Sequence, residues 1–288
     1  MTDDPDANPW RARLGTFGVW RSSRTLDPAL APVLEELGLG ALWIGGAPGD
    51  LRLAEAALDA TTTLVIATGI VNIWTEPAEV VAESFHRVTA RHPGRFLLGI
   101  GVGHPERVGV AAERPFEALL RYLDVLDAEG VPEQDRVIAA LGPRMIRLSG
   151  ERAAGAHPYL VTPAHTREAR ELLGPRPLLA PEQRVVLRAD PVEARTVGRP
   201  TVQTPYLGFT NYRNSLRRLG YAESELDGGG SDRLIDDLVV SGDAATIARR
   251  LGAHLEAGAD HVAVQVLGDQ PARAEDYAEL AEALGLAH

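Results

Sequence analysis

The sequence predicts an α/β fold, a closed (β/α)8 barrel of the TIM type, and three observations lead to that prediction. Short apolar runs alternate with helix-like runs along almost all of the 288 residues. The apolar runs are continuous, which is typical of strands buried on both faces of a parallel sheet. About eight such strand–helix units fit into a chain of this length, so we favour the barrel over an open doubly wound sheet.

The expected strands and helices follow one another in a regular order. Asp27, Pro28 and Gly38 give the first long helix an N-cap, a proline at its first position and a glycine at its end. The expected strands cover residues 13–20, 40–46, 63–73, 95–103, 136–142, 155–161, 183–189 and 260–268. The expected helices cover residues 28–38, 50–62, 77–92, 115–130, 143–153, 165–173 and 274–285.

Residues 190–258 break this rhythm between the seventh and eighth expected strands. The stretch is too long for one helix, and "DGGGSD" at 227–232 is typical of a turn. We therefore expect a helical insertion on a single barrel domain of residues 1–288. Insertions at the carboxyl ends of barrel strands often shape substrate pockets, and a packing or dimer contact is the alternative role.

The composition excludes several function classes. A net charge of −11 with scattered basic residues argues against a nucleic-acid partner. No apolar run approaches the roughly 20 residues of a membrane span, and the acidic, polar start argues against a secretory signal, so we expect a cytoplasmic protein. The absence of cysteine excludes thiolate chemistry, and the absence of lysine excludes Schiff-base catalysis.

The stretch "RFLLGIGVGHPER" at 95–107 resembles a dinucleotide-binding loop because of its glycines at 99, 101 and 103. That fingerprint needs glycines at relative positions 1, 3 and 6. Counted from Gly99 the sixth position is His104, and counted from Gly101 it is Glu106. Both registers fail, so we reject a Rossmann site.

Ligands of such barrels bind at the carboxyl ends of the strands, and the residues expected there are mostly glycine, tryptophan and aliphatic. No Asp, Glu and His cluster has metal-ligand spacing, and neither a glycosidase carboxylate pair nor a serine elbow is visible. The few side chains at these strand ends are expected to leave room for a large flat ligand that carries the reaction chemistry itself. We expect the substrate pocket to be lined by Phe17, Trp20, Trp43 and Trp74, which otherwise are ordinary barrel residues.

Four segments resemble the bacterial-luciferase-like (LLM class) family, and within it the deazaflavin-dependent oxidoreductases that use coenzyme F420. They are "ATGIVNI" (67–73), "GRFLLGIGVGH" (94–104), "ALGPRMIRLSGERAAGAHPY" (140–159) and "AGADHVAVQVL" (257–267). The resemblance implies a (β/α)8 barrel with the deazaflavin across its strand ends. It also implies a non-prolyl cis peptide at Gly69–Ile70 or the next bond; a β-bulge without a ligand is the alternative.

The resemblance further implies the residues that contact the cofactor. Arg144 and the backbone at the start of helix 143–153 would meet an anion, although Arg144 is otherwise a solvated helix residue. The implied cofactor-binding residues are Gly69, Ile70, Val71, Asn72, Gly101, Val102, Gly103, Leu141, Gly142, Pro143, Arg144 and His157.

His104 is the catalytic candidate. Some family members carry a Glu proton donor there, and a His suits proton transfer near neutral pH; it otherwise only hydrogen-bonds a ligand. Those members also carry an Asp-His pair at the end of the second strand, where this chain has Gly45, Gly46 and Ala47. The departure argues against the sugar-phosphate dehydrogenase activity of those members.

The leading hypothesis is hydride transfer between C5 of F420 and a small organic substrate with an enoyl, imine or carbonyl group. An FMN-dependent luciferase-like monooxygenase is the second hypothesis, and a non-catalytic flavin- or deazaflavin-binding barrel is the third. No metal is expected. The alanine-rich helices over 51–62 and 77–92 lead us to expect a homodimer.

Overall fold

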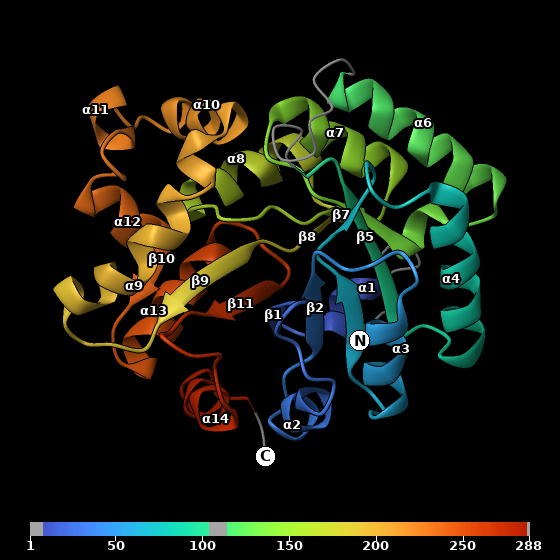
Figure 1. Cartoon of the computed structure of the whole chain (residues 1–288), viewed down its shortest axis with the longest axis horizontal. Coiled ribbons are helices and arrows are strands. Elements are labelled where there is room, and N and C mark those ends of the chain that lie inside the picture. Colours follow the sequence, from blue (N-terminus) through green and yellow to red (C-terminus); the bar gives the residue numbers. More distant parts are fainter. Residues whose placement is uncertain (1–7, 104–113, 287–288) are drawn as a thin grey trace.

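Parallel strands curl around a central axis and helices cover them from outside, as Figure 1 shows for the computed structural model of the chain. The structure describes residues 8–103 and 114–286. Within them the strands form one sheet in the order β10-β9-β11-β1-β2-β3-β5-β6-β7-β8, with β4 paired to β5. The strands are β1 Phe17–Ser22, β2 Ala41–Gly45, β3 Val65–Thr68, β4 Val71–Asn72, β5 Phe96–Gly101, β6 Arg136–Ile138, β7 Gly155–Ala156, β8 Leu178–Leu179, β9 Glu182–Val186, β10 Val239–Ser241 and β11 Val262–Val266.

The helices alternate with these strands, and several begin where the sequence places a proline. Proline occupies an early position of α1, α6, α7, α8 and α9, where its missing N–H breaks no helical hydrogen bond. The outer helices are α2 Leu30–Glu36, α3 Arg52–Asp59, α4 Ala78–Arg91, α6 Pro115–Ala128, α7 Pro143–Arg152, α8 Pro163–Leu173, α13 Ala244–Glu256 and α14 Ala274–Ala283.

The barrel closes through one extended stretch, Leu178–Val186, that comprises β8 and β9. Its first part pairs with β7, and Ala180 N and Glu182 N continue the hydrogen bonds to that side. Its other edge pairs with β11, which in turn pairs with β1. The described strands therefore complete a ring of the (β/α)8 type, as the sequence predicts, and β10 extends the sheet beside β9.

Two hydrophobic layers result from the alternation of side chains along each strand. One set of residues points outward and packs against the helices, as Leu42, Ile66 and Leu98 do. The other set fills the barrel, with Trp43 and Leu97 among its fully buried members. The alanines of α3 and α4 that are buried, such as Ala54 and Ala82, face the outer layer, so they serve packing on the barrel; a homodimer stays a prediction.

Three expected elements differ in the structure. Residues 9–14 form helix α1, so the first strand begins at Phe17 and not at residue 13. The third expected strand, 63–73, divides into β3 and β4. The stretch 190–258 ends in β10 and α13, which pack on the barrel; the helical part before them comprises α9 Pro191–Gln203, η2 Tyr206–Gly208, α10 Thr210–Arg218, α11 Glu223–Leu226 and α12 Asp232–Leu238.

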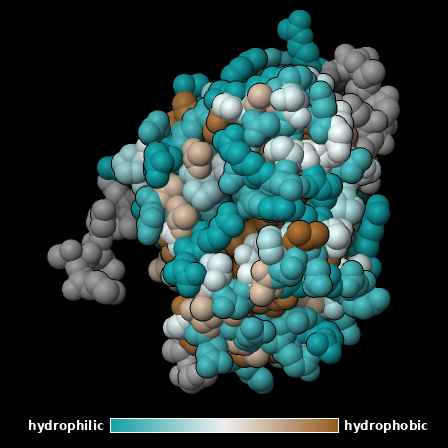
Figure 2. Space-filling view, turned by 90° about the vertical axis from the view of Figure 1, so that its left-hand side faces the viewer, coloured by the Kyte–Doolittle hydropathy of each residue, from teal (hydrophilic) through white to brown (hydrophobic). Residues whose placement is uncertain are grey.

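The helical part of the insertion forms the left-hand side of Figure 1. Figure 2 turns this side to the viewer and shows a mostly hydrophilic surface with small hydrophobic spots. Arg195, on α9, reaches Asp232 and Asp236 of α12 at 2.9 and 2.5 Å, one of several ion pairs within this part. The apolar residues of the insertion instead form a second core of their own.

Candidate functional site

The ends of three neighbouring strands, β3, β5 and β6, form a half-exposed part of the barrel mouth. After Thr68, the last residue of β3, the peptide bond Gly69–Ile70 is cis, where the resemblance implies such a bond. Strand β4 follows at once and pairs with the end of β5. Gly69 and Ile70 form a bulge between β3 and β4. Both residues are only half-buried, so a ligand can reach this bulge.

Trp74 ties the bulge to the end of β5. Its Nε1 donates a hydrogen bond to Val102 O at 2.7 Å, and its backbone N donates to Asn72 Oδ1 at 3.0 Å. Gly103 has a φ of +52°, and a Cβ there would lie 2.7 Å from Asn72 Nδ2, so glycine is needed. All four residues are half-buried and adjacent, and their roles at the site stay predictions.

Trp20 lies across the inner side of these strand ends. Its Nε1 donates to Gly69 O at 3.0 Å. A Cβ on Gly45 would lie 1.9 Å from the Trp20 ring, and one on Gly101 would lie 2.8 Å from Ala139 Cβ. The expectation that glycine strand ends leave empty room therefore needs correction: protein fills the space on the side-chain side, and the backbone stays half-exposed at Gly69.

His157 lies beneath the bulge, inside the barrel and 1% exposed. Its Nδ1 lies 2.6 Å from Ala180 O, and this nitrogen carries the proton because a carbonyl can only accept. Its ring stacks on Trp43 with centroids 4.1 Å apart. Burial lowers the pKa of His157 to about 4. The neutral ring thus keeps an Nε2 lone pair without a partner among the described residues, 2.9 Å from where a Cβ on Gly69 would lie.

The loop between β6 and α7 carries the predicted anion contacts. Gly142 is the N-cap of α7, no side chain caps it, and a Cβ there would meet nothing within 4 Å. Arg144 is exposed, and its guanidinium lies 4.1 Å from the centre of the Phe116 ring. Leu141, Gly142 and Pro143 are half-buried. The open helix start next to an exposed cation suits an anionic group.

Three predicted residues lie away from this surface, and a fourth is outside the described part of the chain. Phe17 points to the outer hydrophobic layer, because it alternates with the inward Trp20 along β1, so we do not include it in the pocket. Val71 is fully buried in that outer layer, and Trp43 is fully buried inside the barrel, where its Nε1 contacts His261 Nε2. His104 lies outside the described residues, and its role as an acid stays a prediction.

A polar cluster lies on the opposite side of the mouth, and it was not predicted from the sequence. We call its members Tyr159, Glu182, Arg184 and Gln265 the Tyr159–Arg184 cluster. Arg184 Nη2 donates to the Tyr159 hydroxyl at 2.9 Å, and that hydroxyl donates to Gln265 Oε1 at 2.8 Å. Glu182 Oε1 lies 4.0 Å from Arg184 Nε. Neither of these two atoms has a hydrogen-bond partner among the described residues.

Both charged members of the cluster are buried within β9, and "EQRVV" (182–186) carried the signal that could have found them. Residues two apart in a strand point to one side, so Glu182 and Arg184 must share a face. Burial raises the pKa of Glu182 to about 7 and keeps the Tyr159 hydroxyl protonated by raising its pKa. The mouth therefore holds more ionisable groups than its glycine-rich ends suggest.

The insertion covers this side of the mouth with aromatic rings. Tyr206, in η2, packs 5.7 Å from Tyr159 and 5.0 Å from Tyr212 between ring centroids. Tyr212 donates its hydroxyl proton to Tyr159 O at 3.0 Å. The Arg184 guanidinium lies 5.3 Å from the Tyr159 ring and 4.8 Å from the Tyr206 ring. The arginine is thus held between two rings beneath the insertion.

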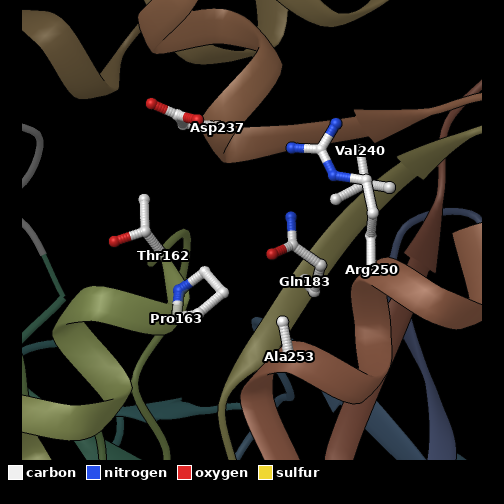
Figure 3. A pocket seen from close by; sticks show the side chains of 7 residues that line it. All are labelled: Thr162, Pro163, Gln183, Asp237, Val240, Arg250 and Ala253. Carbon is white, nitrogen blue, oxygen red and sulfur yellow. The ribbon is translucent and has the colours of Figure 1, made fainter. Parts of the chain in front are cut away.

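A separate cavity of about 220 Å³ lies between α8, β10 and α13 (Figure 3). Gln183 lines it, and this residue points away from the barrel interior because Glu182 and Arg184 point inward. The polar side chains there have protein partners: Gln183 contacts His254 and Leu238 O, Arg250 contacts Asp236 O, and Asp237 accepts from Tyr221. We do not place the cofactor there.

No group of three or more His, Asp or Glu side chains within 8–103 and 114–286 is arranged to hold a metal ion. Among the described helices, none has the length and apolar character needed to cross a membrane.

Comparisons with known proteins agree on the architecture. The family model for luciferase-like monooxygenases matches residues 28–129, and no curated protein matches. An F420-dependent secondary alcohol dehydrogenase, solved with an F420-acetone adduct, superposes with a TM-score of 0.68 at 17% identity over 93% of this chain and 98% of that chain.

Two further similar structures differ from each other in cofactor: one protein is described as F420-dependent, and the other was solved with FMN. The coenzyme F420-dependent tetrahydromethanopterin reductase of Methanopyrus kandleri has a TM-score of 0.64 at 17% identity, over 93% of this chain and 97% of that one. The oxygenating constituent of 3,6-diketocamphane monooxygenase of Pseudomonas putida, solved with FMN, has a TM-score of 0.66 at 15% identity, over 94% and 96%. The family model therefore matches part of the chain, and the solved structures share its barrel fold.

Proposed function

We propose that this protein is an F420-dependent oxidoreductase that transfers a hydride between C5 of the deazaflavin and a small organic substrate with an enoyl, imine or carbonyl group. The observation that carries the proposal is the half-exposed backbone of Gly69 and Ile70, in a bulge beside the ends of β5 and β6. The unused Nε2 of His157 behind that bulge and the open helix start at Gly142 fit a polar, anionic cofactor.

Backbone groups would hold most of the cofactor. Residues 69–72 and 101–103 would lie along the ring, and Leu141, Gly142, Pro143 and Arg144 would meet the anionic part, with His157 supporting the bulge from behind. When bound, the reduced deazaflavin supplies the hydride. The chain contributes orientation, exclusion of water by the insertion, and a placed proton donor, for which His104 stays a candidate.

A second candidate is an FMN-dependent monooxygenase, and two observations favour it. The matching family model describes luciferase-like monooxygenases, and one similar structure was solved with FMN. A third possibility, a barrel that binds such a cofactor without turnover, has the same surface and differs only in its activity.

The test is a titration of the purified protein with F420 and, separately, with FMN, followed by fluorescence. We expect F420 to bind at least tenfold more tightly, and the bound reduced form to reduce one member of a panel of enones, imines and carbonyl compounds. Preferential FMN binding with oxygen-dependent turnover would support the monooxygenase. Tight F420 binding with no turnover on any acceptor would support the binding barrel.

A further inference from the structure

The Tyr159–Arg184 cluster is built in a way that packing alone does not require. It places an arginine and a glutamate, 3% and 0% exposed, on the inner face of one strand. Buried charges are costly unless they are paired and hydrogen-bonded, yet Glu182 Oε1 and Arg184 Nε have no hydrogen-bond partner among the described residues. Such unsatisfied buried groups are more frequent at functional sites than in ordinary cores.

Tyr159 links this cluster to the bulge through Trp20. Its ring centroid is 5.1 Å from that of Trp20, which in turn hydrogen-bonds Gly69 O. The hydroxyl accepts from Arg184 Nη2 at 2.9 Å and donates its proton to Gln265 Oε1 at 2.8 Å. Tyr159 and Gln265 are both half-buried, whereas Arg184 is buried behind them. The Tyr159 hydroxyl, a proton donor, therefore lies between the Arg184 guanidinium and the side-chain oxygen of Gln265 at the mouth.

We propose that Tyr159, in place of the sequence candidate His104, is the catalytic proton donor of this site and that the substrate carries a carbonyl group, whose oxygen takes the acceptor position that Gln265 Oε1 holds in the structure. This inference rests on the proposed function, because it needs a reduced deazaflavin as hydride donor. It narrows the substrate class from enoyl, imine or carbonyl compounds to ketones and aldehydes.

The step balances in atoms and electrons. The carbonyl carbon gains a hydride from the reduced deazaflavin, the C=O π bond breaks, and the oxygen takes the proton of Tyr159, so an alcohol forms and the cofactor is oxidised. Tyr159 is left as a phenolate, which water reprotonates. A carbonyl oxygen needs this proton because negative charge develops on it as the hydride arrives.

Arg184 is a positioning residue in this scheme. Its Nη1 donates to Thr201 O at 2.7 Å and to Thr201 Oγ1 at 3.0 Å, which fixes the guanidinium against α9. A cation held 2.9 Å from the phenol oxygen stabilises the phenolate without having to move during the reaction. The rings of Tyr159 and Tyr206 keep water away from it.

The test compares Tyr159→Phe with Tyr221→Phe. Both changes remove one phenol hydroxyl, but the Tyr221 hydroxyl donates to Asp237 within the insertion. Each protein is titrated with F420 by fluorescence and with isobutyramide, an unreactive amide carbonyl, by tryptophan fluorescence. Turnover is then measured with a panel of ketones and aldehydes, and with a tetrazolium dye that needs no proton on oxygen.

We expect Tyr159→Phe to bind F420 within twofold of the wild type, to bind isobutyramide about tenfold more weakly, and to reduce the carbonyl substrate at least 100-fold more slowly with dye reduction unchanged. Tyr221→Phe should match the wild type throughout. Unchanged carbonyl reduction in Tyr159→Phe, or an equal loss of F420 binding and dye reduction, overturns the assignment of Tyr159. A wild type that binds F420 but reduces enones or imines alone overturns the carbonyl class, and a wild type that binds no F420 overturns the proposed function as well.

Discussion

The two sides of the barrel mouth differ in the groups they present: one side presents mainly backbone, and the other presents mainly side chains. On the side of β3, β5 and β6, the strand ends expose backbone, and the neutral His157 lies buried behind them. On the side of β7, β9 and β11, side chains dominate, with a tyrosine, an arginine and a glutamate beneath the aromatic rings of the insertion. The first side suits the face and edges of a planar cofactor, and the second suits a reacting polar group.

This difference suggests separate roles for the two sides, cofactor binding for the first and proton transfer for the second. Backbone groups at rigid strand ends bind a large ligand with little loss of conformational entropy, because they are already ordered. Proton transfer needs a side chain whose environment sets its ionisation, and among the described residues the charged side provides one. Four variants test this division, in decreasing order of expected effect.

Arg184→Met should have the largest effect on stability. It removes the guanidinium from a buried cluster and leaves the Tyr159 hydroxyl and Glu182 without it, so we expect the free energy of unfolding to fall by about 3–5 kcal/mol. Urea unfolding measures the loss. The double variant with Glu182→Gln should recover part of the stability. If Arg184→Met alone is as stable as the wild type, the contacts of Arg184 with Tyr159 and Glu182 do not stabilise the fold.

Glu182 should make stability depend on pH. Its pKa is raised by burial to about 7 in the folded state, against 4.5 when unfolded, so the folded state keeps a proton that the unfolded state loses. Stability from this group therefore falls as pH rises from about 4.5 to about 7, in total by about 3 kcal/mol.

Glu182→Gln removes that titration. The difference in unfolding free energy between this variant and the wild type should therefore grow with pH across the same window, as measured by urea unfolding at half-unit steps. Buried His157, with its pKa lowered to about 4, acts in the opposite direction in both proteins and cancels in the difference. A difference that stays constant with pH would contradict the raised pKa.

Gly99→Ala tests the backbone side. A Cβ on Gly99 would lie 1.8 Å from Thr68 O, a backbone atom that cannot move aside without shifting β3. We expect a loss of about 1–3 kcal/mol in thermal or urea unfolding. The matched control is Gly142→Ala, where a Cβ meets nothing within 4 Å and the change should stay within about 0.5 kcal/mol. Equal stability of the two variants would show that close strand contact does not require glycine here.

Trp20→Phe should have the smallest effect. It keeps an aromatic ring across the strand ends and removes the hydrogen bond to Gly69 O, at a cost of about 1 kcal/mol. F420 affinity should weaken only a few-fold, because the bulge loses one anchor while the ring contacts stay. A loss of more than 100-fold would mean that Trp20 itself contacts the cofactor strongly.

Much of the fold was predictable because it depends on local patterns. Continuous apolar runs such as "RFLLGIGVG" indicate buried parallel strands, and prolines at helix starts place most outer helices within a few residues. Residues 9–14 were missed because a single helical turn and a half has too few residues to show a period. β10 was missed because "VVS" follows α12 directly, within a stretch already interpreted as helical.

The candidate site was less predictable because it depends on which way side chains point. Phe17 and Trp20 look equivalent in the sequence, yet they lie on opposite faces of β1. The glycine ends suggested free space, whereas the Trp20 ring occupies the space beside Gly45. Glu182 and Arg184 attracted no attention, since a charged pair in a short strand is equally compatible with a solvated edge.

The sequence by itself determined the barrel class and the absence of lysine and cysteine chemistry, because both follow from composition and local patterns. The family resemblance placed the bulge at Gly69–Ile70 or the next bond. Only the tertiary structure decided that Leu178–Val186 closes the ring, that the insertion covers one side of the mouth, and that Tyr159, Arg184 and Gln265 meet. Those contacts join residues up to 106 positions apart. No local sequence pattern predicts which residues of distant strands meet in the closed sheet.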